Sequence, residues 1–152
     1  MDQKDRQIIR ALQRNGRMTN QDLAREVSLS PSPCLRRLKL LEKSGVIKGY
    51  TADIDAEAYG LPVTAFVRVT LTSHSGESVK KFEQEISRVE QVLECFVMTG
   101  TSDYLLRVVV ADLAGYERFV RKYLHAVPGI GSIDSSFVYS TVKKTGVYPP
   151  VV

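Results

Sequence analysis

The chain has 152 residues, of which 43% are hydrophobic and 25% are charged, a balance typical of a globular protein that buries a core. No apolar run reaches the roughly 18 residues that a membrane-spanning helix needs, and the first residues lack the layout of a secretory signal, so we expect a cytoplasmic protein with no membrane partner. Two cysteines and two histidines, without ligand spacing, argue against a disulfide framework and against a metal site.

Positive charge is concentrated in the first third of the chain. Residues 1–52 hold 11 Lys and Arg against 5 Asp and Glu, a net charge of +6, whereas residues 53–152 hold 10 against 12, a net charge of −2. A concentrated positive field attracts polyanions and accelerates their encounter with the protein. Many solvated helices are equally basic, but the distribution favours double-stranded DNA as the partner of the first segment.

Three short helices are predicted in the first 45 residues. The first covers residues 5–15, and the second opens at Thr19, whose hydroxyl can cap free amides at the start of a helix. The third opens at Ser30, whose hydroxyl can cap in the same way, and Pro31 fits the first helical position, where its missing N–H costs nothing. Residues 46–54 are rich in β-forming residues and predict a short hairpin beside the helices. This order describes a winged helix-turn-helix.

The predicted third helix has two different sides. Its packing stripe is apolar at helical spacing and comprises Cys34, Leu38 and Leu41. Its opposite side is hydroxylic or basic and comprises Ser32, Arg36, Lys39 and Lys43. Such a helix fits the major groove of DNA. The alternative is a small helical bundle with a solvated basic face, but the serine-proline start, the tight turn and the wing favour DNA binding.

The expected DNA contacts fall into two classes. Arg36 is the first choice for reading bases, because a guanidinium can form two hydrogen bonds with guanine, and Ser32 is the second. Phosphate contacts are expected from the longer basic side chains and from the start of the second helix, and these residues are Arg37, Lys39, Lys43, Lys48, Asn20 and Gln21. Ser30 and Pro33, at the start of the third helix, complete the expected interface.

The rest of the chain alternates strands and helices after a linker at residues 53–62. Strands are predicted at 63–71, 92–100, 104–111 and 132–142, with amphipathic helices at 75–89 and 113–127. Two βαβ units of this kind form a ferredoxin-like α+β domain, in which helices cover one face of an antiparallel sheet. The other face is expected to be apolar and to be covered by a second copy, which predicts a homodimer. The predicted domains are therefore 1–52 for DNA binding and 63–152 for effector binding and oligomerisation.

The turn between the two βαβ units, residues 99–105, is the second candidate site. Its residue types are also ordinary for a turn that has no further role. However, Gly100 permits close approach of the backbone, and Asp103 supplies a counter-charge. The turn could therefore receive the carboxylate and ammonium that every α-amino acid carries.

Several stretches of the sequence resemble a known family. Residues 5–52, DRQIIRALQRNGRMTNQDLAREVSLSPSPCLRRLKLLEKSGVIKGYTA, closely resemble the helix-turn-helix of the Lrp/AsnC (leucine-responsive, feast/famine) regulators, and GTSDYLL with PGIGSIDSSFVY resembles their ACT-like sensing domain. The resemblance implies operator binding by a dimer-based assembly, a tetramer or commonly an octamer, that responds to an amino acid at contacts between dimers. It also implies further pocket residues, which are Thr101, Tyr104, Ser135 and Ser136. The family's turn often carries an acidic residue after the glycine, whereas Thr101 follows Gly100 here, which leaves the ligand's identity open.

The sequence is best interpreted as a transcription regulator whose assembly or DNA affinity responds to an amino acid. An architectural, chromosome-organising protein without a true ligand is the alternative. An enzyme is not expected, because the sequence offers no phosphate-cradling loop, no metal cluster and no nucleophile with a base, and hence no catalytic residue and no cofactor.

Overall fold

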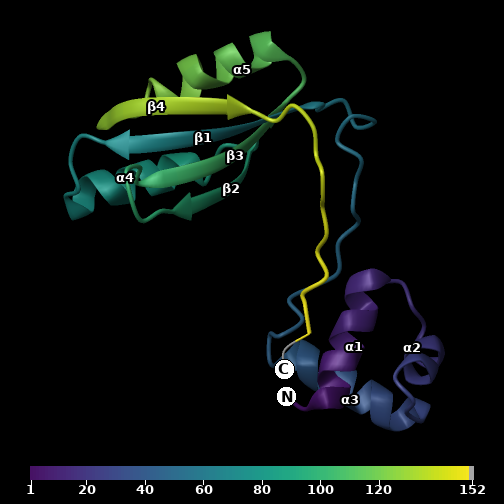
Figure 1. The fold of residues 1–152 in the computed structure, drawn as a ribbon. Coiled ribbons are helices and arrows are strands. Elements are labelled where there is room, and N and C mark those ends of the chain that lie inside the picture. Colours follow the sequence, from purple (N-terminus) through teal and green to yellow (C-terminus); the bar gives the residue numbers. More distant parts are fainter. Residues whose placement is uncertain (151–152) are drawn as a thin grey trace. The chain divides into compact units, whose positions relative to one another are not determined.

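The computed structural model describes residues 1–150, which form two compact units (Figure 1). One unit comprises residues 1–53 together with 142–150, and the other comprises residues 54–141. The domain limits read from the sequence stay predictions. The C-terminal residues, however, group with the helices of the first unit and not with the sheet.

The first unit is built on the helices α1 (Gln3–Arg14), α2 (Asn20–Glu26) and α3 (Pro31–Lys43). Asp2 and Asp5 form a reciprocal capping box on α1, and at the start of α2 the Thr19 hydroxyl oxygen accepts from the Asp22 N–H. A small apolar core joins the three helices, and its buried members are Ile8, Ala11, Leu23, Ala24, Val27, Cys34 and Leu41. The three predicted helices are confirmed.

The connection between α2 and α3 is a tight turn that ends α2 in a Schellman motif. Ser28 adopts a φ of 51°, and it is the only non-glycine residue in the described chain with a positive φ. Its N–H donates to the Arg25 carbonyl at 3.1 Å, and the Leu29 N–H donates to the Ala24 carbonyl at 2.9 Å. These two bonds satisfy the Ala24 and Arg25 carbonyls near the end of α2 and fix the direction in which the chain enters α3.

The start of α3 only partly matches the prediction. Ser30 is the residue before the helix and Pro31 is its first residue, but the Ser30 hydroxyl makes no capping hydrogen bond. The reason lies in the sequence, because Pro33 occupies the third helical position and lacks the N–H that a capping serine commonly binds. The predicted helix start is confirmed, and the predicted hydroxyl cap is wrong.

The hairpin expected at residues 46–54 does not form, because the described chain contains no strand before β1 (Val63–Leu71). The segment after α3 is held by other contacts. The Ile47 N–H donates to the Leu41 carbonyl at 3.1 Å, and the Tyr50 hydroxyl donates to the Glu42 carboxylate at 2.8 Å. Of the β-forming side chains in this stretch, Ile47 packs against the helical core, whereas Val46, Tyr50 and Ile54 are exposed.

The second unit is a four-stranded antiparallel sheet with helices on one face. Its elements after β1 are α4 (Gly76–Ile86), β2 (Val92–Val97), β3 (Tyr104–Val110), α5 (Leu113–Phe119), the π-helical turn η1 (Val120–Leu124) and β4 (Ile130–Phe137). The strand order is β2-β3-β1-β4, with each neighbouring pair antiparallel. The two βαβ units therefore interleave, because β3 lies between β1 and β2, and β1 lies between β3 and β4. The predicted ferredoxin-like α+β fold is confirmed.

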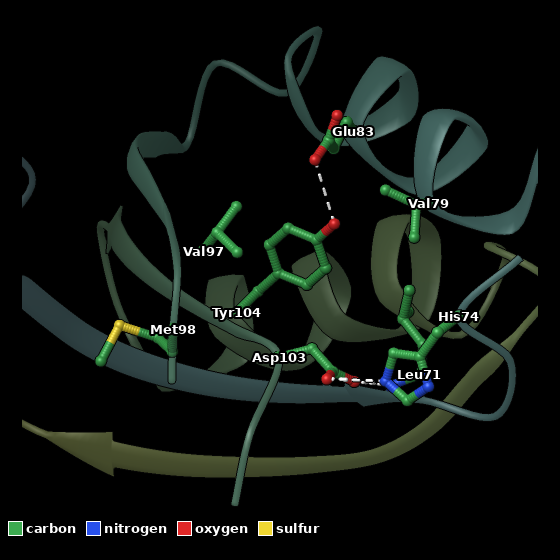
Figure 2. Close-up of a pocket in the computed structure, with 8 residues that line it drawn as sticks. All are labelled: Leu71, His74, Val79, Glu83, Val97, Met98, Asp103 and Tyr104. Atoms are coloured by element: carbon green, nitrogen blue, oxygen red, sulfur yellow. Dashed lines mark hydrogen bonds and ion pairs between the residues drawn. The ribbon is translucent and has the colours of Figure 1, made fainter. Parts of the chain in front are cut away.

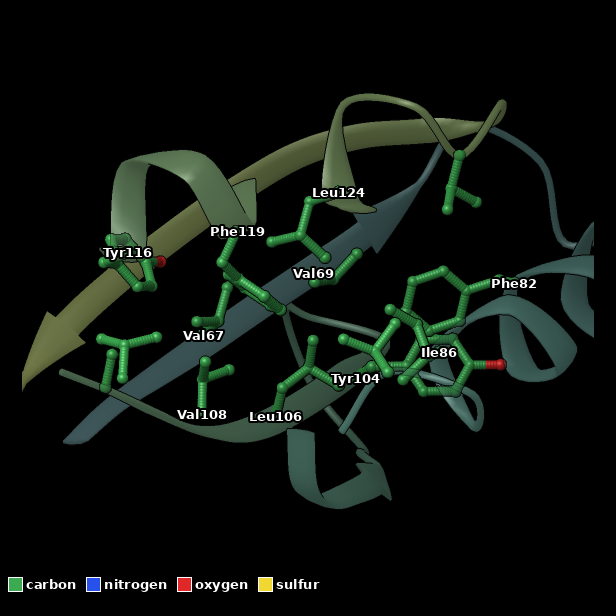
Figure 3. Close-up of a cluster of buried hydrophobic side chains, with 14 of the residues drawn as sticks. Val67, Val69, Phe82, Ile86, Tyr104, Leu106, Val108, Tyr116, Phe119 and Leu124 are labelled. Carbon is green, nitrogen blue, oxygen red and sulfur yellow. The ribbon is translucent and has the colours of Figure 1, made fainter. Parts of the chain in front are cut away.

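The core of the second unit lies between the sheet and its two helices (Figure 3). Alternate residues of β1 and β3 point into it, as the strand period requires. Its labelled members in Figure 3 are Val67, Val69, Phe82, Ile86, Tyr104, Leu106, Val108, Tyr116, Phe119 and Leu124. Because α4 and α5 contribute to the same cluster, both helices cover the same face of the sheet.

The opposite face of the sheet carries both apolar and charged side chains, whereas the sequence pattern alone predicted an apolar face. Phe96 pairs with Leu105 across β2 and β3 and remains 46% exposed. Arg68 and Asp134 also lie on this face and form an ion pair of 3.2 Å between β1 and β4. The face therefore combines apolar side chains with paired charges.

The C-terminal segment is bound to α1 within the first unit. The Gln13 side chain donates to the Gly146 carbonyl at 2.8 Å and accepts from the Tyr148 N–H at 3.2 Å. Lys144 forms an ion pair with Asp53 at 2.8 Å. One amide side chain thus binds both polar groups of a passing backbone, as a neighbouring strand would.

No helix among residues 1–150 is long and apolar enough to cross a membrane. Within the same residues, no group of three or more histidine, cysteine or acidic side chains could hold a metal ion.

Candidate nucleic-acid interface and effector pocket

The two sides of α3 differ in the way that the sequence predicts. Cys34 and Leu41 are buried in the helical core, and Leu38 packs against it. The residues of the expected DNA-facing side are all exposed, and they are Ser32, Arg36, Lys39 and Lys43. One side of the helix is therefore available to a partner while the other holds it in place.

Arg36 and Arg37 have different surroundings although they are adjacent. Arg36 is exposed and makes no hydrogen bond or ion pair within residues 1–150. The Arg37 guanidinium is half-buried and binds two carboxylates of α1's capping box, Asp2 at 2.7 Å and Asp5 at 2.8 Å. The Asp5 N–H, followed by Arg37, lowers the pKa of Asp2, and the two carboxylates raise the pKa of Arg37. Arg37 thus connects α3 to the start of α1.

The other expected DNA contacts lie around the start of α2 and α3. The Asn20 side-chain amide donates to the Pro31 carbonyl at 2.9 Å and so connects α2 with the first turn of α3. Gln21 and Ser30 are exposed beside it, and Pro33 is partly buried. Lys48 is exposed in the segment after α3. Apart from Asn20 and Arg37, the residues expected to contact DNA make no side-chain bond within residues 1–150 that would compete with a partner.

A cavity of about 190 Å³ lies where the β2–β3 turn meets the ends of β1 and α4 (Figure 2). Its lining is apolar with four ionisable groups, and it comprises Leu71, His74, Val79, Glu83, Val97, Met98, Asp103 and Tyr104. A second hollow of about 320 Å³ shares Glu83, Val97 and Tyr104 with the first. The turn that the sequence singles out therefore forms one wall of a cavity.

Asp103 ties the turn to the end of β1. Its Oδ2 accepts from the Leu71 N–H at 2.7 Å, and its Oδ1 lies 2.8 Å from Nε2 of His74. The Leu71 N–H, followed by His74, lowers the pKa of the Asp103 carboxyl. Gly100, in the same turn, has a φ of 119°, which a residue with a side chain rarely adopts. The turn is therefore shaped by both residues that the sequence predicts to matter.

Tyr104 forms the floor of the cavity and is 3% exposed. Its hydroxyl donates to the Glu83 carboxylate at 3.0 Å, as Figure 2 shows, and its ring packs 4.5 Å from that of Phe82. Burial, followed by the hydrogen bond to Glu83, raises the pKa of Tyr104 to about 12. Tyr104 is therefore a neutral hydroxyl across the physiological pH range.

The structure separates the other expected effector residues from this cavity. Ser135 lies opposite Val67, and its hydroxyl shares a hydrogen bond with the Tyr116 hydroxyl. Ser136 lies opposite Phe66 on the other face, because consecutive strand residues point to opposite sides. Neither serine lines the cavity, and neither do Gly100 and Thr101. Of the expected set, only Asp103 and Tyr104 do.

Sequence reasoning missed several lining residues, above all His74 and Glu83. His74 carries no recognisable ligand spacing in the sequence, and in the structure its Nε2 lies 2.8 Å from Oδ1 of Asp103. The pairing of Val69 with Tyr104 explains why these residues line the cavity, because it brings the end of β1 beside the start of β3. Once antiparallel pairing of these strands is assumed, the residues following Leu71 must approach the turn.

The chain matches two family models, one for each unit. Residues 1–48 match the model of the winged helix-turn-helix DNA-binding domain, and residues 64–148 match that of the Lrp/AsnC ligand binding domain.

Curated relatives extend over nearly the whole chain. The bkd operon transcriptional regulator of Pseudomonas aeruginosa is 42% identical over 149 residues, which cover 98% of this chain and 97% of the relative. The transcriptional regulator AzlB of Bacillus subtilis is 36% identical over 149 residues, covering 98% of this chain and 95% of the relative.

Solved structures agree with these matches. A transcriptional regulator of Neisseria meningitidis, determined as a complex with L-Met, has a TM-score of 0.94 at 38% identity and covers 98% of this chain and 96% of that chain. AsnC of Escherichia coli has a TM-score of 0.88 at 21% identity, a likeness of fold, over 98% of this chain and 99% of that chain.

Proposed function

Because the chain belongs to the Lrp/AsnC family of DNA-binding transcription regulators, we propose that it changes its assembly or its DNA affinity when an amino acid binds beside the β2–β3 turn. The observation that carries the proposal is the cavity at Asp103 and Tyr104 within the ligand-binding unit. The neisserial relative, whose structure holds L-Met, supports an amino acid as the ligand class.

The exposed side of α3 is the proposed DNA-reading surface. We assign base contacts to Arg36 and Ser32, because both are exposed and Arg36 is uncommitted among the described residues. Phosphate contacts are assigned to Lys39, Lys43 and Lys48, with Gln21 at the exposed start of α2. For Arg37 and Asn20 the observed bonds favour positioning of α3 over direct contact with DNA.

The amino acid is proposed to bind by its backbone groups near the turn and by its side chain in the cavity. Leu71, Val79, Val97 and Met98 supply an apolar lining, which suits an apolar side chain. Each Asp103 oxygen already accepts one hydrogen bond and retains a further lone pair, so the carboxylate can still accept from the effector's ammonium.

We expect the regulator to act as a homodimer through the mixed face of its sheet, with further assembly to a tetramer or octamer. Two copies of α3 related by a two-fold axis would then meet successive major grooves and read a roughly palindromic site. Neither catalysis nor a bound cofactor forms part of this proposal, and a cytoplasmic location stays a prediction.

An architectural DNA-binding protein without a ligand is the second candidate. The observation in its favour is that Asp103 already has a structural task, since it ties the turn to Leu71 and His74. In that reading the turn is complete without an effector.

Thermal denaturation of the full chain with each of the twenty amino acids at millimolar concentration separates the two candidates. A ligand selective for the native state stabilises it by about 2.7 kcal/mol at a concentration 100 times its Kd. We expect at least one amino acid to raise the melting temperature and to change the DNA affinity in a gel-shift assay. If none does while DNA still binds, the sensing role is lost and the architectural role remains.

A further inference from the structure

The cavity beside the β2–β3 turn has an unbalanced set of charges. Its ionisable lining residues are Asp103 and Glu83, both acids, Tyr104, which is neutral because its pKa is raised to about 12, and His74. Cys95 lies on β2 and lines the second hollow, and partial desolvation, followed by the charge of Glu83, raises the pKa of its thiol. His74 is therefore the only side chain in the lining that can carry a positive charge. An amino acid brings a carboxylate into this site, and that carboxylate requires a cationic partner or N–H donors.

His74 is held in a defined orientation by one ring nitrogen, and its other ring nitrogen is available for a further hydrogen bond. It lies between β1 and α4, and its Nε2 faces Asp103 Oδ1 at 2.8 Å, as Figure 2 shows. Because an ionised carboxylate only accepts, Nε2 must carry the proton of this bond. Its side chain is 68% exposed, and Nδ1 makes no bond within residues 1–150. The imidazole thus has one nitrogen that fixes it and a second that can gain a proton.

We propose that His74 is the group that receives the effector's carboxylate, and that it does so in its protonated form while Asp103 orients the ring. The proposal rests on the proposed amino-acid function and names the group that makes the site selective for a carboxylate. In the imidazolium, Nε2 donates to Asp103 and Nδ1 donates to the ligand. Asp103 is then a positioning residue for the ring, and its remaining lone pairs can accept from the ammonium, which is bonded to the same carbon as the carboxylate.

The sign of the pH dependence follows from this assignment. Histidine loses its positive charge as the pH rises through the physiological range, and the facing acids, Asp103 and Glu83, repel a carboxylate that has no cation to bind. The Asp103 carboxyl, with its lowered pKa, stays ionised throughout this range, and the Tyr104 hydroxyl stays neutral. Affinity for a ligand with a carboxylate should therefore fall as the pH rises from 5.5 to 8.

The test is calorimetric titration of the full-length protein with L-methionine and with L-methioninol, which lacks the carboxylate. We expect L-methionine to bind about tenfold more weakly at pH 8 than at pH 5.5, and L-methioninol to bind equally at both. In His74→Gln, L-methionine should bind at every pH as weakly as it binds the parent protein at pH 8. His74→Lys should restore tight binding at both pH values, because its charge persists.

His125→Gln is the matched control, because His125 is exposed, is the only other histidine of the chain and does not line the cavity. It should leave the pH dependence unchanged. Persistent pH dependence in His74→Gln, or the same dependence for L-methioninol, would overturn the role of His74 while leaving amino-acid sensing intact. If none of the twenty amino acids binds the parent protein, the proposed function fails, and this role fails with it.

Discussion

Arg36 and Arg37 are neighbours in the sequence, but a helix rotates about 100° per residue, so they meet different surroundings. Periodicity places Arg36 on the basic side of α3 and Arg37 closer to the packing stripe, but it reveals no partner for either. What separates them is the capping box of α1, because Asp2 and Asp5 bind the Arg37 guanidinium and leave that of Arg36 exposed. Such a long-range pairing cannot be read from a local pattern.

Replacement of Arg36 by alanine should remove about 1 to 3 kcal/mol of binding free energy on the cognate operator and relax the preference at one base pair. Lys48→Ala should weaken binding to every sequence by a similar factor and reduce the slope of affinity against salt, because a phosphate contact releases a counterion. Fluorescence anisotropy with cognate and random duplexes measures both effects. Equal losses on the two duplexes for Arg36→Ala would contradict the assignment of base reading.

Asp103 should make the stability of the sheet unit sensitive to acid. Its folded-state pKa is lowered by the Leu71 N–H and by His74, so its stabilising contribution is present above its ordinary value of 3.8 and is lost as the pH falls through the folded value. Urea unfolding of the protein from pH 6 to pH 3 should therefore show a steeper loss of stability than that of Asp103→Asn. Parallel pH profiles for the two proteins would rule this contribution out.

At the scale of elements, the α2–α3 turn depends on a residue in the left-handed region. Ser28→Val should lower the free energy of unfolding by about 1 to 2 kcal/mol, because a β-branched side chain fits poorly at a positive φ of 51°. Ser28→Gly, the matched control, should be as stable as the parent or slightly more stable. Denaturant melts followed by circular dichroism give both values, and a stable Ser28→Val protein with unchanged DNA affinity would refute the argument.

Element types were predictable where the apolar period is local and strong. The three helices and the four strands follow from such periods, but their ends do not. The strand predicted to run to residue 142 ends at Phe137, and the helix predicted at 113–127 becomes a π-helical turn after Phe119. The predicted hairpin at 46–54 failed because β-propensity depends on a neighbouring strand to pack and pair with, and in this stretch only Ile47 packs against the helical core.

The candidate site was predictable only in part for a related reason. Asp103 and Tyr104 lie in the turn that the sequence identifies, and both line the cavity. His74 and Glu83 reach it from segments some 20 to 30 positions away in the chain, through strand pairing and the packing of α4. Ser135 was expected beside them by resemblance, but in a single chain it is bonded to Tyr116.

At the scale of the whole molecule, the mixed face of the sheet should hold two copies together. Phe96→Glu adds a charge to that face, where Phe96 is 46% exposed, and should shift the protein toward monomer in sedimentation velocity. Leu113→Glu is the control, because Leu113 is 64% exposed at the start of α5, on the helix-covered side of the sheet, and its variant should assemble normally. If Phe96→Glu remains fully assembled, the dimer uses another surface.

The contact between Gln13 and the backbone around Gly146 also affects how the protein can be divided. Since residues 142–150 group with the helices, the sheet-forming stretch is an insertion between two parts of the first unit. A recombinant fragment that stops at residue 53 would lack the C-terminal segment that binds Gln13. The DNA-binding part is therefore better produced by deleting residues 54–141 and joining residue 53 to residue 142.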